Sequence, residues 1–359
     1  MMKISFVISG FARKASGGHK IIYEYANYLI QKGDEVNIYF LNTNSLSNVK
    51  IPKGIKMFIS SFVAKYSKIR WFELDKKIKR YAISRINDYS IHDGDVIIAC
   101  DVKTPKFVSG LDKSKGEKVY LIQDFENWLV SDRYVYETYQ LKMKKIVISK
   151  WLEEIVNTYS ETPSVLIPDG IDTRNFSCKI NYEERENYSI CFHYRKASIK
   201  GCKYAIETIF LLKTIIPKLK VKVISNEHKP KELPDWCEFY YNQSSSQVAE
   251  INNSVRVFMC TSINEGYGLP ALEAMACGCA VVSTDYLGAK EYAIDGYNAL
   301  LSPTKNVEEM VKNIMKIFKN ENLGKELSKN GIRTGQKFSS EVSCQKFEKA
   351  IKWENGKVI

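Results

Sequence analysis

The chain has 359 residues, 45% of them hydrophobic, and carries a formal net charge of +12. This length predicts two domains, and the hydrophobic content excludes a disordered chain. The nine cysteines are odd in number and include no Cys-x-x-Cys pair, so a disulfide framework and a zinc ribbon are excluded in favour of reduced thiols. No signal peptide and no 18-residue apolar span are present, which predicts a soluble, cytoplasmic protein.

The positive charge calls for an anionic partner. We expect no nucleic acid, because no nucleic-acid-binding motif is present and a basic pI alone is weak evidence. Anionic lipid and phosphorylated substrates fit the charge equally well. The densest basic stretch, residues 65–80, would place five cations on one face of a helix: Lys65, Lys68, Lys76, Lys79 and Arg80. Such a helix is either simply solvated or lies on the surface of an anionic membrane.

Strand and helix patterns alternate through the first half. Gly17 and Gly18 follow the first strand, where paired glycines let backbone approach a ligand closely, although such a pair is more often only a turn. Asp93-Gly94-Asp95 has the form of a metal-binding pair, but it precedes its strand, which predicts a turn. Apolar runs predict buried parallel strands at Ile4–Ile8, Val36–Phe40, Val96–Ala99, Val119–Ile122 and Ile146–Ile148, with helices such as His19–Gln31 between them.

Two polar segments follow these strands. Asp124 comes directly after Val119–Ile122 and is a candidate for contact with a substrate, or alternatively a cap of the following helix. The charged stretch 178–187 predicts a linker between an N-terminal domain, residues 1–177, and a C-terminal domain, residues 188–335. Helical sequence resumes at Val307 and continues into a tail, residues 336–359.

The second half repeats the alternation and predicts a second parallel sheet. Arg195 and Lys200 follow its first strand, and two fixed cations there can neutralise a pyrophosphate and stabilise it as it departs. The predicted strands are Tyr188–His193, Val221–Ser225, Glu238–Tyr241, Val255–Thr261 and Cys279–Ser283. The predicted fold is therefore α/β, with two Rossmann-like parallel-sheet domains that bind ligands at the carboxyl ends of their strands.

Residues 261–285, TSINEGYGLPALEAMACGCAVVSTD, carry the most specific signal. A strand ends in the turn Gly266–Gly268, and Pro270 opens a helix whose N-terminus can seat a phosphate. Glu265 and Glu273 flank that seat and would be repelled by phosphate, so they predict contacts with the hydroxyls of a nucleotide sugar. The relaxed dinucleotide fingerprint also matches, but an acid before the first glycine makes a nicotinamide oxidoreductase a poor alternative.

This segment resembles the E-G-[FY]-G-[LI]-x3-E-A-M-A-x-G signature of retaining family 4 glycosyltransferases of the GT-B fold. The match is nearly complete, and one departure is Cys279-Ala280, where the family usually carries a proline. The matching residues are Glu265, Gly266, Tyr267, Gly268, Leu269, Glu273, Ala274, Met275, Ala276 and Gly278. The resemblance implies two Rossmann-like domains that face a central cleft, with the tail at 336–359 crossing back onto the first domain.

The resemblance also implies a reaction. A hexose or deoxyhexose would pass from a nucleotide diphosphate sugar to an acceptor with retention of configuration, without a protein nucleophile, a metal or another cofactor. Glu265 would hold sugar hydroxyls, and Glu273 would hold the ribose. Arg195 and Lys200 would hold the leaving phosphate, which would deprotonate the acceptor. Asp124 would contact the acceptor or the sugar. The implied donor-binding residues are Gly17, Gly18, Arg195, Lys200, Gly266, Tyr267, Gly268, Leu269 and Glu273.

The acceptor side of the resemblance is less specific. Gln123 stands where the family often has histidine, and the form Gln123-Asp124-Phe125-Glu126 resembles a branch that includes rhamnosyltransferases. We expect a glycan or lipid-linked saccharide acceptor in bacterial surface polysaccharide synthesis, and a cytoplasmic enzyme peripheral at the inner face of the membrane. The alternative is a catalytically silent nucleotide-sugar-binding or scaffold subunit of the same fold, against which the intact Arg195, Lys200, Glu265 and Glu273 argue.

Overall fold

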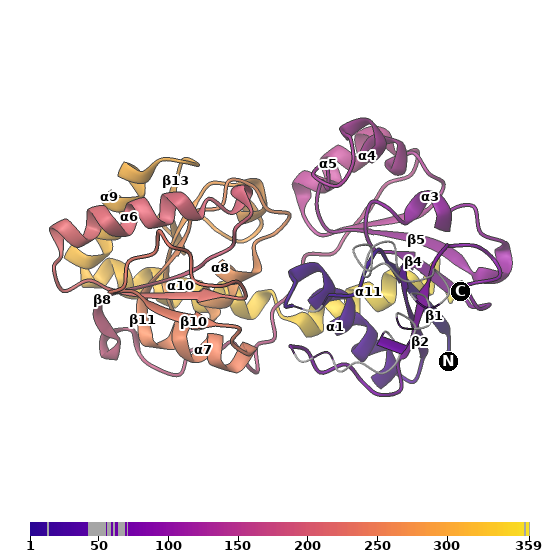
Figure 1. Ribbon diagram of the computed structural model, residues 1–359, viewed down its shortest axis with the longest axis horizontal. Coiled ribbons are helices and arrows are strands. Elements are labelled where there is room, and N and C mark those ends of the chain that lie inside the picture. The colour runs from indigo at the N-terminus through magenta and orange to yellow at the C-terminus, as the bar shows by residue number, and fades with distance from the viewer. Residues whose placement is uncertain are drawn as a thin grey trace. The chain divides into compact units, whose positions relative to one another are not determined.

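The computed structural model describes residues 1–12, 14–41, 71–354 and 357–358, together with residues 55, 59, 62, 63 and 69, and describes no side chain beyond residue 352. The chain divides into two compact units (Figure 1). The first unit comprises Met1–Pro168 and Ser343–Ile359, and the second comprises Asp169–Val342. None of the helices in the described part of the chain has the length and apolar character that a membrane span requires.

The first unit is built on a parallel sheet with the strand order β3-β2-β1-β4-β5-β6-β7. Its strands are β1 Lys3–Ile8, β2 Glu35–Leu41, β3 Lys79–Ile83, β4 Val96–Ala99, β5 Glu117–Ile122, β6 Lys144–Val147 and β7 Val165–Leu166. Its helices are α1 Gly17–Gln31, α3 Pro105–Val108, α4 Asp132–Tyr139, α5 Lys150–Tyr159 and the later part of α11 Ser340–Lys352. The central strands are apolar and buried on both faces, as expected where helices cover a parallel sheet on both sides.

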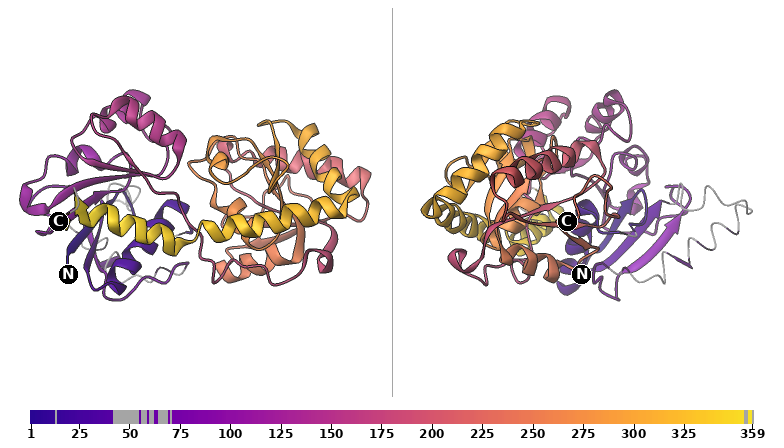
Figure 2. Two further views of the ribbon diagram at one scale, coloured as in Figure 1. Left: turned by 180° about the vertical axis from the view of Figure 1, so that it is seen from behind. Right: turned by 60° about the vertical axis from the view of Figure 1, so that its left-hand side comes forward.

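Helix α11 completes the core of the first unit. The ring of Phe347 stacks on Tyr25 of α1, with the ring centroids 3.9 Å apart and the planes inclined by 5°. Tyr28 of α1 donates a hydrogen bond to Glu348 at 3.1 Å, and Lys352 forms an ion pair with the buried Asp34 at 2.5 Å. Helices α1 and α11 therefore lie side by side (Figures 1 and 2). The two-stranded antiparallel hairpin β14 Trp353–Glu354 and β15 Lys357–Val358 follows.

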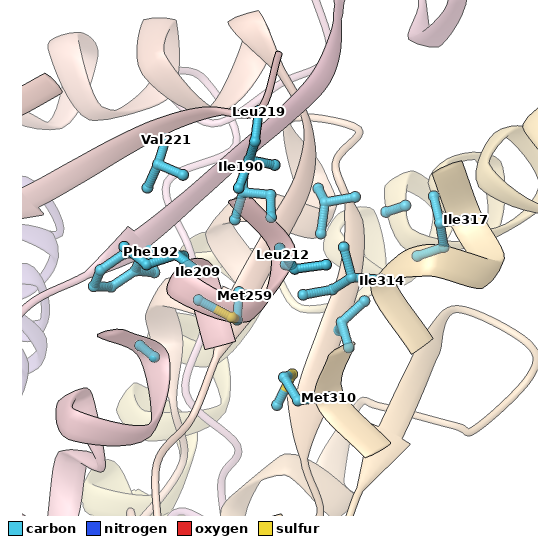
Figure 3. Packing of buried hydrophobic residues seen from close by; sticks show 14 of the residues in the cluster. Ile190, Phe192, Ile209, Leu212, Leu219, Val221, Met259, Met310, Ile314 and Ile317 are labelled. Atoms are coloured by element: carbon cyan, nitrogen blue, oxygen red, sulfur yellow. The ribbon is translucent and has the colours of Figure 1, made fainter. Parts of the chain in front are cut away.

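The second unit repeats this plan with a six-stranded sheet in the order β10-β9-β8-β11-β12-β13. Its strands are β8 Glu186–His193, β9 Lys220–Ser225, β10 Glu238–Tyr241, β11 Val255–Cys260, β12 Ala280–Thr284 and β13 Ala299–Ser302. Its helices are α6 Cys202–Ile215, α7 Ser245–Ser254, α8 Leu269–Ala276, α9 Val307–Lys319 and α10 Glu321–Lys337. Ile190 on β8 and Met259 on β11 pack against Leu212 of α6 and Ile314 of α9 in one continuous core (Figure 3).

In both parallel sheets, the order in which the chain visits the strands reverses in the middle. The chain passes from β1 outward to β2 in the first unit and then returns to β4, and it passes from β8 to β9 in the second unit before it returns to β11. At such a switch point, the loops after the two central strands diverge and leave a crevice at the carboxyl edge of the sheet. The site residues predicted from the sequence are therefore expected at the carboxyl edges of the two sheets, where such folds usually bind ligands.

The predicted linker at 178–187 is wrong. This stretch lies in the second unit, where residues Tyr182–Glu184 form a 3-10 turn and Glu186 begins β8. Its Arg185 is only 3% exposed, and the guanidinium donates to the carbonyls of Ile180 at 2.8 Å, Cys277 at 2.5 Å and Val255 at 3.1 Å. The boundary between the units falls earlier, after Pro168, because the polar side chains of 178–187 bind the unit that follows.

The predicted basic helix at 65–80 is also wrong over its described residues. Lys76 lies in a turn, and Lys79 and Arg80 lie in strand β3, while Lys65 and Lys68 fall outside the described residues. Lys79 forms an ion pair with Glu35 of the neighbouring strand at 2.7 Å. β3 is an edge strand, which carries polar side chains on its outer side and so loses the apolar pattern of a buried strand.

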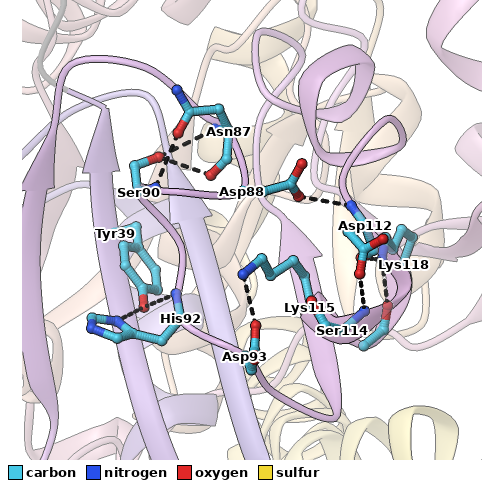
Figure 4. Close-up of polar contacts among 11 residues, drawn as sticks. Tyr39, Asn87, Asp88, Ser90, His92, Asp93, Asp112, Ser114, Lys115 and Lys118 are labelled. Atoms are coloured by element: carbon cyan, nitrogen blue, oxygen red, sulfur yellow. Dashed lines mark hydrogen bonds and ion pairs between the residues drawn. The ribbon is translucent and has the colours of Figure 1, made fainter.

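The Asp93-Gly94-Asp95 stretch is a loop before β4. Asp93 forms an ion pair with Lys115 at 2.7 Å (Figure 4). Asp95 accepts a hydrogen bond from the backbone N–H of Lys3 at 2.6 Å. Both carboxylates therefore join this loop to its neighbours at the amino end of the sheet, as the turn prediction requires.

Candidate functional site

Two loops meet at the carboxyl ends of β8 and β11 in the second unit. Arg195 lies two residues beyond β8, Lys200 ends the 3-10 turn Ser198–Lys200, and Glu265 lies in the loop after β11. The loops are joined because Ile263 donates its N–H to the carbonyl of Ile199 at 2.7 Å. The structure therefore brings together the two predicted cations and the first predicted carboxylate.

Gly201 makes this approach possible. It adopts a left-handed conformation with φ +60°, and a Cβ atom there would lie 1.9 Å from the carbonyl oxygen of Thr261. Both the dihedral and the space exclude a side chain at this position. The glycine thus allows the turn that carries Lys200 to lie against the loop that carries Glu265.

Lys200 and Glu265 form an ion pair, with 3.3 Å between Nζ and Oε2. The side chain of Glu265 is 13% exposed and that of Lys200 is 32% exposed, so both are partly withdrawn from water. Burial lowers the pKa of Arg195, and the negative charges of Glu227 and Glu265 act in the opposite direction. Arg195 donates from Nη1 to the carbonyl of Tyr194 at 2.8 Å. The edge therefore carries two cations, each with a partner in the loops that follow β8 and β11.

The glycine turn of the signature begins α8. Gly268 has φ +95° and caps the helix, with Pro270 in its first turn. A Cβ atom on Gly268 would lie 1.9 Å from the hydroxyl of Tyr286. Tyr292 donates its hydroxyl to the carbonyl of Gly268 at 2.7 Å, and its oxygen lies 3.0 Å from that of Tyr286. Two buried tyrosines thus hold the amino end of an eight-residue helix, whose first N–H groups can receive an anion.

The remaining residues of the signature are buried around this turn. Glu273 lies on α8 and is 7% exposed, Leu269 is buried at the first helical position, and Gly266 precedes the buried Tyr267. The ring of Tyr267 packs against Tyr292, with the centroids 5.6 Å apart. A carboxylate buried this deeply in an otherwise apolar helix is expensive to keep unless it has a function or a partner.

Other residues that fix the site were not predicted from the sequence. Ser262 donates its hydroxyl to Oε1 of Glu265. Glu227 accepts a hydrogen bond from the backbone N–H of Lys196 at 2.9 Å, and Ser225 donates its hydroxyl to the carbonyl of Tyr194 at 3.0 Å. The available signal was position alone: Ser225 ends β9, and Glu227 and Ser262 lie two residues beyond the ends of β9 and β11.

Gly17, Gly18 and Asp124 lie in the first unit, at the carboxyl ends of β1 and β5. A Cβ atom on Gly18 would lie 3.4 Å from the side-chain amide of Gln123, so the two segments approach closely. Asp124 accepts a hydrogen bond from the N–H of Phe125 at 2.8 Å. It does not cap the following helix, because the side chain of Ser131 performs that role in α4.

Two further carboxyl groups lie at this edge of the first unit. Asp101 accepts hydrogen bonds from the N–H groups of Ser9 at 2.5 Å and Lys103 at 3.0 Å, and Glu126 accepts one from Val102 at 2.6 Å. Burial, together with the charge of Asp101, raises the pKa of Glu126 to about 8. Burial also raises the pKa of Asp101. This edge thus carries two buried carboxyl groups with raised pKa values.

Over the described residues, no group of three or more histidine, cysteine, aspartate or glutamate side chains is arranged to hold a metal ion. Residues 179–334 match the family model described as "Glycosyl transferases group 1". This segment is therefore similar to group 1 glycosyltransferases. It contains the second unit's sheet, and Arg195, Lys200, Glu265 and Glu273 all lie within it.

Individual proteins extend this comparison. The uncharacterized glycosyltransferase MJ1178 of Methanocaldococcus jannaschii is 28% identical over 217 residues, which cover 59% of this chain and 60% of that protein. N,N'-diacetylbacillosaminyl-diphospho-undecaprenol alpha-1,3-N-acetylgalactosaminyltransferase of Campylobacter jejuni is 28% identical over 110 residues, 31% of this chain and 29% of that protein. The match with this chain thus spans between about a third and three fifths of these relatives.

A solved structure shows that the likeness of fold extends over both units. Anabaena Alr3699/HepE in complex with UDP aligns with a TM-score of 0.74 at 15% identity and covers 98% of this chain and 99% of that chain. The fold is therefore the α/β GT-B type with two Rossmann-like parallel-sheet domains that the sequence predicted.

Proposed function

We propose that this protein is a retaining glycosyltransferase that moves a hexose or deoxyhexose from a nucleotide diphosphate sugar to a saccharide acceptor. One observation carries the proposal: Lys200 and Glu265 are paired at 3.3 Å beside the amino end of α8, within the segment that matches the group 1 glycosyltransferase model. A cation and a helix N-terminus suit a diphosphate, and a fixed carboxylate suits the hydroxyls of the attached sugar.

In this proposal the second unit holds the donor. Arg195, Lys200 and the N–H groups near Gly268 and Leu269 bind the diphosphate and stabilise the charge that develops on it. The bond between the sugar C1 and the phosphate oxygen breaks, the acceptor oxygen bonds to C1 from the same face, and the acceptor proton passes to the departing phosphate. Glu265 holds the sugar hydroxyls and stabilises the positive charge that develops on the sugar. Glu273 binds the ribose.

The same residues support a reaction that needs no metal. Because Arg195 and Lys200 both lie near Glu265, they can supply the positive charge that a divalent cation supplies to diphosphate leaving groups elsewhere. Turnover should therefore persist in excess EDTA. Loss of turnover in EDTA, restored by magnesium or manganese, would contradict this part of the proposal.

The proposals for the acceptor and the sugar rest on one relative and on a short sequence resemblance. The Campylobacter jejuni relative is named for a lipid-diphosphate-linked saccharide acceptor, which supports a glycan or lipid-linked saccharide here. The resemblance of Gln123–Glu126 to a branch that includes rhamnosyltransferases supports rhamnose as one sugar to test. Gly17, Gly18 and Asp124 are the first unit's contributions to donor and acceptor binding. A panel of rhamnose, glucose and N-acetylhexosamine donors, with release of nucleotide diphosphate as the readout, would test the sugar.

A cytoplasmic setting with peripheral contact at an anionic membrane is supported by the charge of +12. The basic helix that first suggested this contact is not present in the described residues, so the charge alone supports it. Flotation with anionic and neutral vesicles tests the contact, since electrostatic binding should require anionic lipid and be lost at high salt. A wild-type protein that ignores anionic vesicles at low salt would contradict it.

The proposed function is tested by donor binding followed by transfer. Thermal-shift assays with UDP, GDP, dTDP and ADP should identify at least one nucleotide that raises the melting temperature, since a ligand that binds only the native state stabilises it. The corresponding nucleotide sugar should then be consumed in the presence of an acceptor extract, and more slowly by Glu265→Gln. A protein stabilised by NADH and by none of the four nucleotides would favour the oxidoreductase alternative. Donor binding without any turnover would favour the silent-subunit alternative.

A further inference from the structure

Both carboxylate oxygens of Glu265 are held by side chains of the second unit. Oε2 pairs with Lys200 at 3.3 Å, and Oε1 accepts the hydroxyl of Ser262, three residues earlier in the same loop. Ser262 is buried, in contrast to the partly exposed Lys200. One partner of the carboxylate is therefore a long, flexible cation and the other is a short side chain attached to a buried backbone.

The position and direction of the Ser262 hydroxyl are themselves fixed. Its backbone carbonyl accepts a hydrogen bond of 2.5 Å from the hydroxyl of Thr284, which ends the neighbouring strand β12. The thiol of Cys260, the last residue of β11, lies 3.6 Å from its oxygen and donates to it. Because the Glu265 carboxylate is an acceptor when ionised, the hydroxyl proton of Ser262 must point toward it. The hydrogen bonds therefore run in one direction, from the Cys260 thiol to the Ser262 oxygen and from the Ser262 hydroxyl to the Glu265 carboxylate.

The hydrogen bond from Ser262 restricts the rotation of the Glu265 carboxylate, which the ion pair with Lys200 alone does not. The terminal torsion of glutamate is soft, so a carboxylate beside a single ammonium group can rotate or turn both oxygens toward the cation. A Glu265 that followed Lys200 in this way would no longer present a fixed oxygen to sugar hydroxyls. A hydrogen bond from a short, buried side chain holds one oxygen in place against the attraction of Lys200.

We propose that Ser262 is a positioning residue for sugar transfer, which acts by fixing the orientation of the Glu265 carboxylate. The inference rests on the proposed function, because it assigns a role to a residue that does not itself touch the donor. It predicts that loss of the Ser262 hydroxyl slows the chemical step and leaves the binding of the nucleotide diphosphate unchanged.

The first test compares Ser262→Ala with Ser328→Ala. Ser328 lies on α10, is similarly buried, and donates a hydrogen bond from its hydroxyl to the carbonyl of Gly278 at 2.7 Å, before β12 begins and away from Glu265. Ser262→Ala should lower kcat roughly 10-fold or more and change the donor KM and the affinity for the nucleotide diphosphate less than about 3-fold. Ser328→Ala should leave kcat within about 3-fold of the wild type. Melting temperatures of both variants, with and without nucleotide, show whether each is folded.

A second test asks whether Ser262 acts through Glu265. Ser262→Ala is combined with Glu265→Ala, and sugar transfer is followed in single turnovers with enzyme in excess. If the serine acts through the carboxylate, its loss should change the rate by less than about 2-fold when the carboxylate is already absent. An equal loss in both backgrounds would overturn the inference and assign Ser262 an independent effect.

The outcomes separate this inference from the proposed function. An active wild type whose turnover is unaffected by Ser262→Ala overturns the inference alone. A wild type that binds nucleotide diphosphate but transfers no sugar from any donor overturns the proposed function, and the inference with it. A folded Ser262→Ala protein that loses nucleotide affinity in proportion to turnover also overturns the inference, because it places the serine in binding instead of in the orientation of Glu265.

Discussion

The two units share one topology and differ in the chemistry at the carboxyl edges of their sheets. In the second unit, Arg195 and Lys200 lie beside Glu265 at the amino end of α8. In the first unit, the corresponding edge carries Asp101 and Glu126, whose carboxyl groups have raised pKa values. The same doubly wound scaffold thus presents cations at one edge and carboxyl groups with raised pKa values at the other.

The sheets of the two units differ little, so this difference in chemistry lies in the loops that follow their strands. A cationic edge with a helix N-terminus suits a diphosphate, whereas an edge of carboxyl groups and glycines suits the neutral hydroxyls of a saccharide. The predictions below test whether the two edges differ in this way, from the largest expected effect to the smallest.

The largest effect should come from the cation at the second unit's edge. Lys200→Ala should lower turnover by roughly 100-fold or more, the scale of losing one charge contact in a transition state. Lys196→Ala is the matched control, since Lys196 is an exposed cation four residues earlier. Equal losses in the two variants, measured as donor consumption at saturating acceptor, would show that general positive charge matters more than the position of Lys200.

The next effect should come from the glycine that joins the two loops. Gly201→Ala should lower the unfolding free energy by about 1–2 kcal/mol for its left-handed backbone. The clash with Thr261 should add about 1–3 kcal/mol. Gly296→Ala is the control, because Gly296 also has a positive φ but a Cβ there would meet no atom within 4 Å. Chemical denaturation of both variants measures the difference, and equal destabilisation would show that the close approach at Gly201 is unimportant.

Glu273 tests the donor side of the second edge. If it binds the ribose, Glu273→Gln should weaken nucleotide diphosphate binding by about 1–3 kcal/mol, the range for a hydrogen bond to a charged group. Calorimetric titration measures this, with the exposed Glu250→Gln on α7 as the control. An affinity equal to that of the wild type would remove Glu273 from the donor site and leave it a buried structural residue.

The smallest effect concerns pH and the first edge. Because the folded state raises the pKa of Glu126 from 4.5 to about 8, it retains a proton that the unfolded state releases in this window. Stability from this group is therefore complete below pH 4.5 and is lost as the pH rises toward 8. Glu126→Gln should remove this loss, so wild type and variant should differ more in melting temperature at pH 8 than at pH 5. A difference that is constant with pH would show that Glu126 ionises normally.

The fold could be predicted because its central strands are continuous apolar runs, as at Val96–Ala99 and Val255–Cys260. The edge strand β3 could not, since its Lys-Arg-Tyr sequence carries no buried pattern and instead fits the basic face of a helix. The linker was misplaced for a related reason: Arg185 is charged, yet it is buried among backbone carbonyls that only the tertiary structure supplies. Polarity in the sequence does not distinguish a solvated side chain from one that binds its own fold.

The site was predictable where short-range pattern sets the geometry. Gly268 and Pro270 determine a turn and a helix start through their own backbone preferences, so Glu265 could be placed beside them. The supporting residues could not be predicted. Tyr286 and Tyr292 reach the turn from the segment after β12, and Glu227 reaches the Arg195 loop from the end of β9. Such contacts depend on which strands become neighbours, and that information appears only in the assembled sheet.

The central claim is that the second unit binds a nucleotide diphosphate through Arg195 and Lys200. The most direct measurement is calorimetric titration of UDP, GDP, dTDP and ADP into the wild-type protein, followed by titration of the best ligand into Arg195→Ala and Lys200→Ala. We predict saturable binding of at least one nucleotide, weakened by about 10-fold or more in each variant, since a hydrogen bond to a charged group contributes about 1.5–3 kcal/mol. Binding that is unchanged in both variants, or the absence of binding by all four nucleotides, would contradict the account.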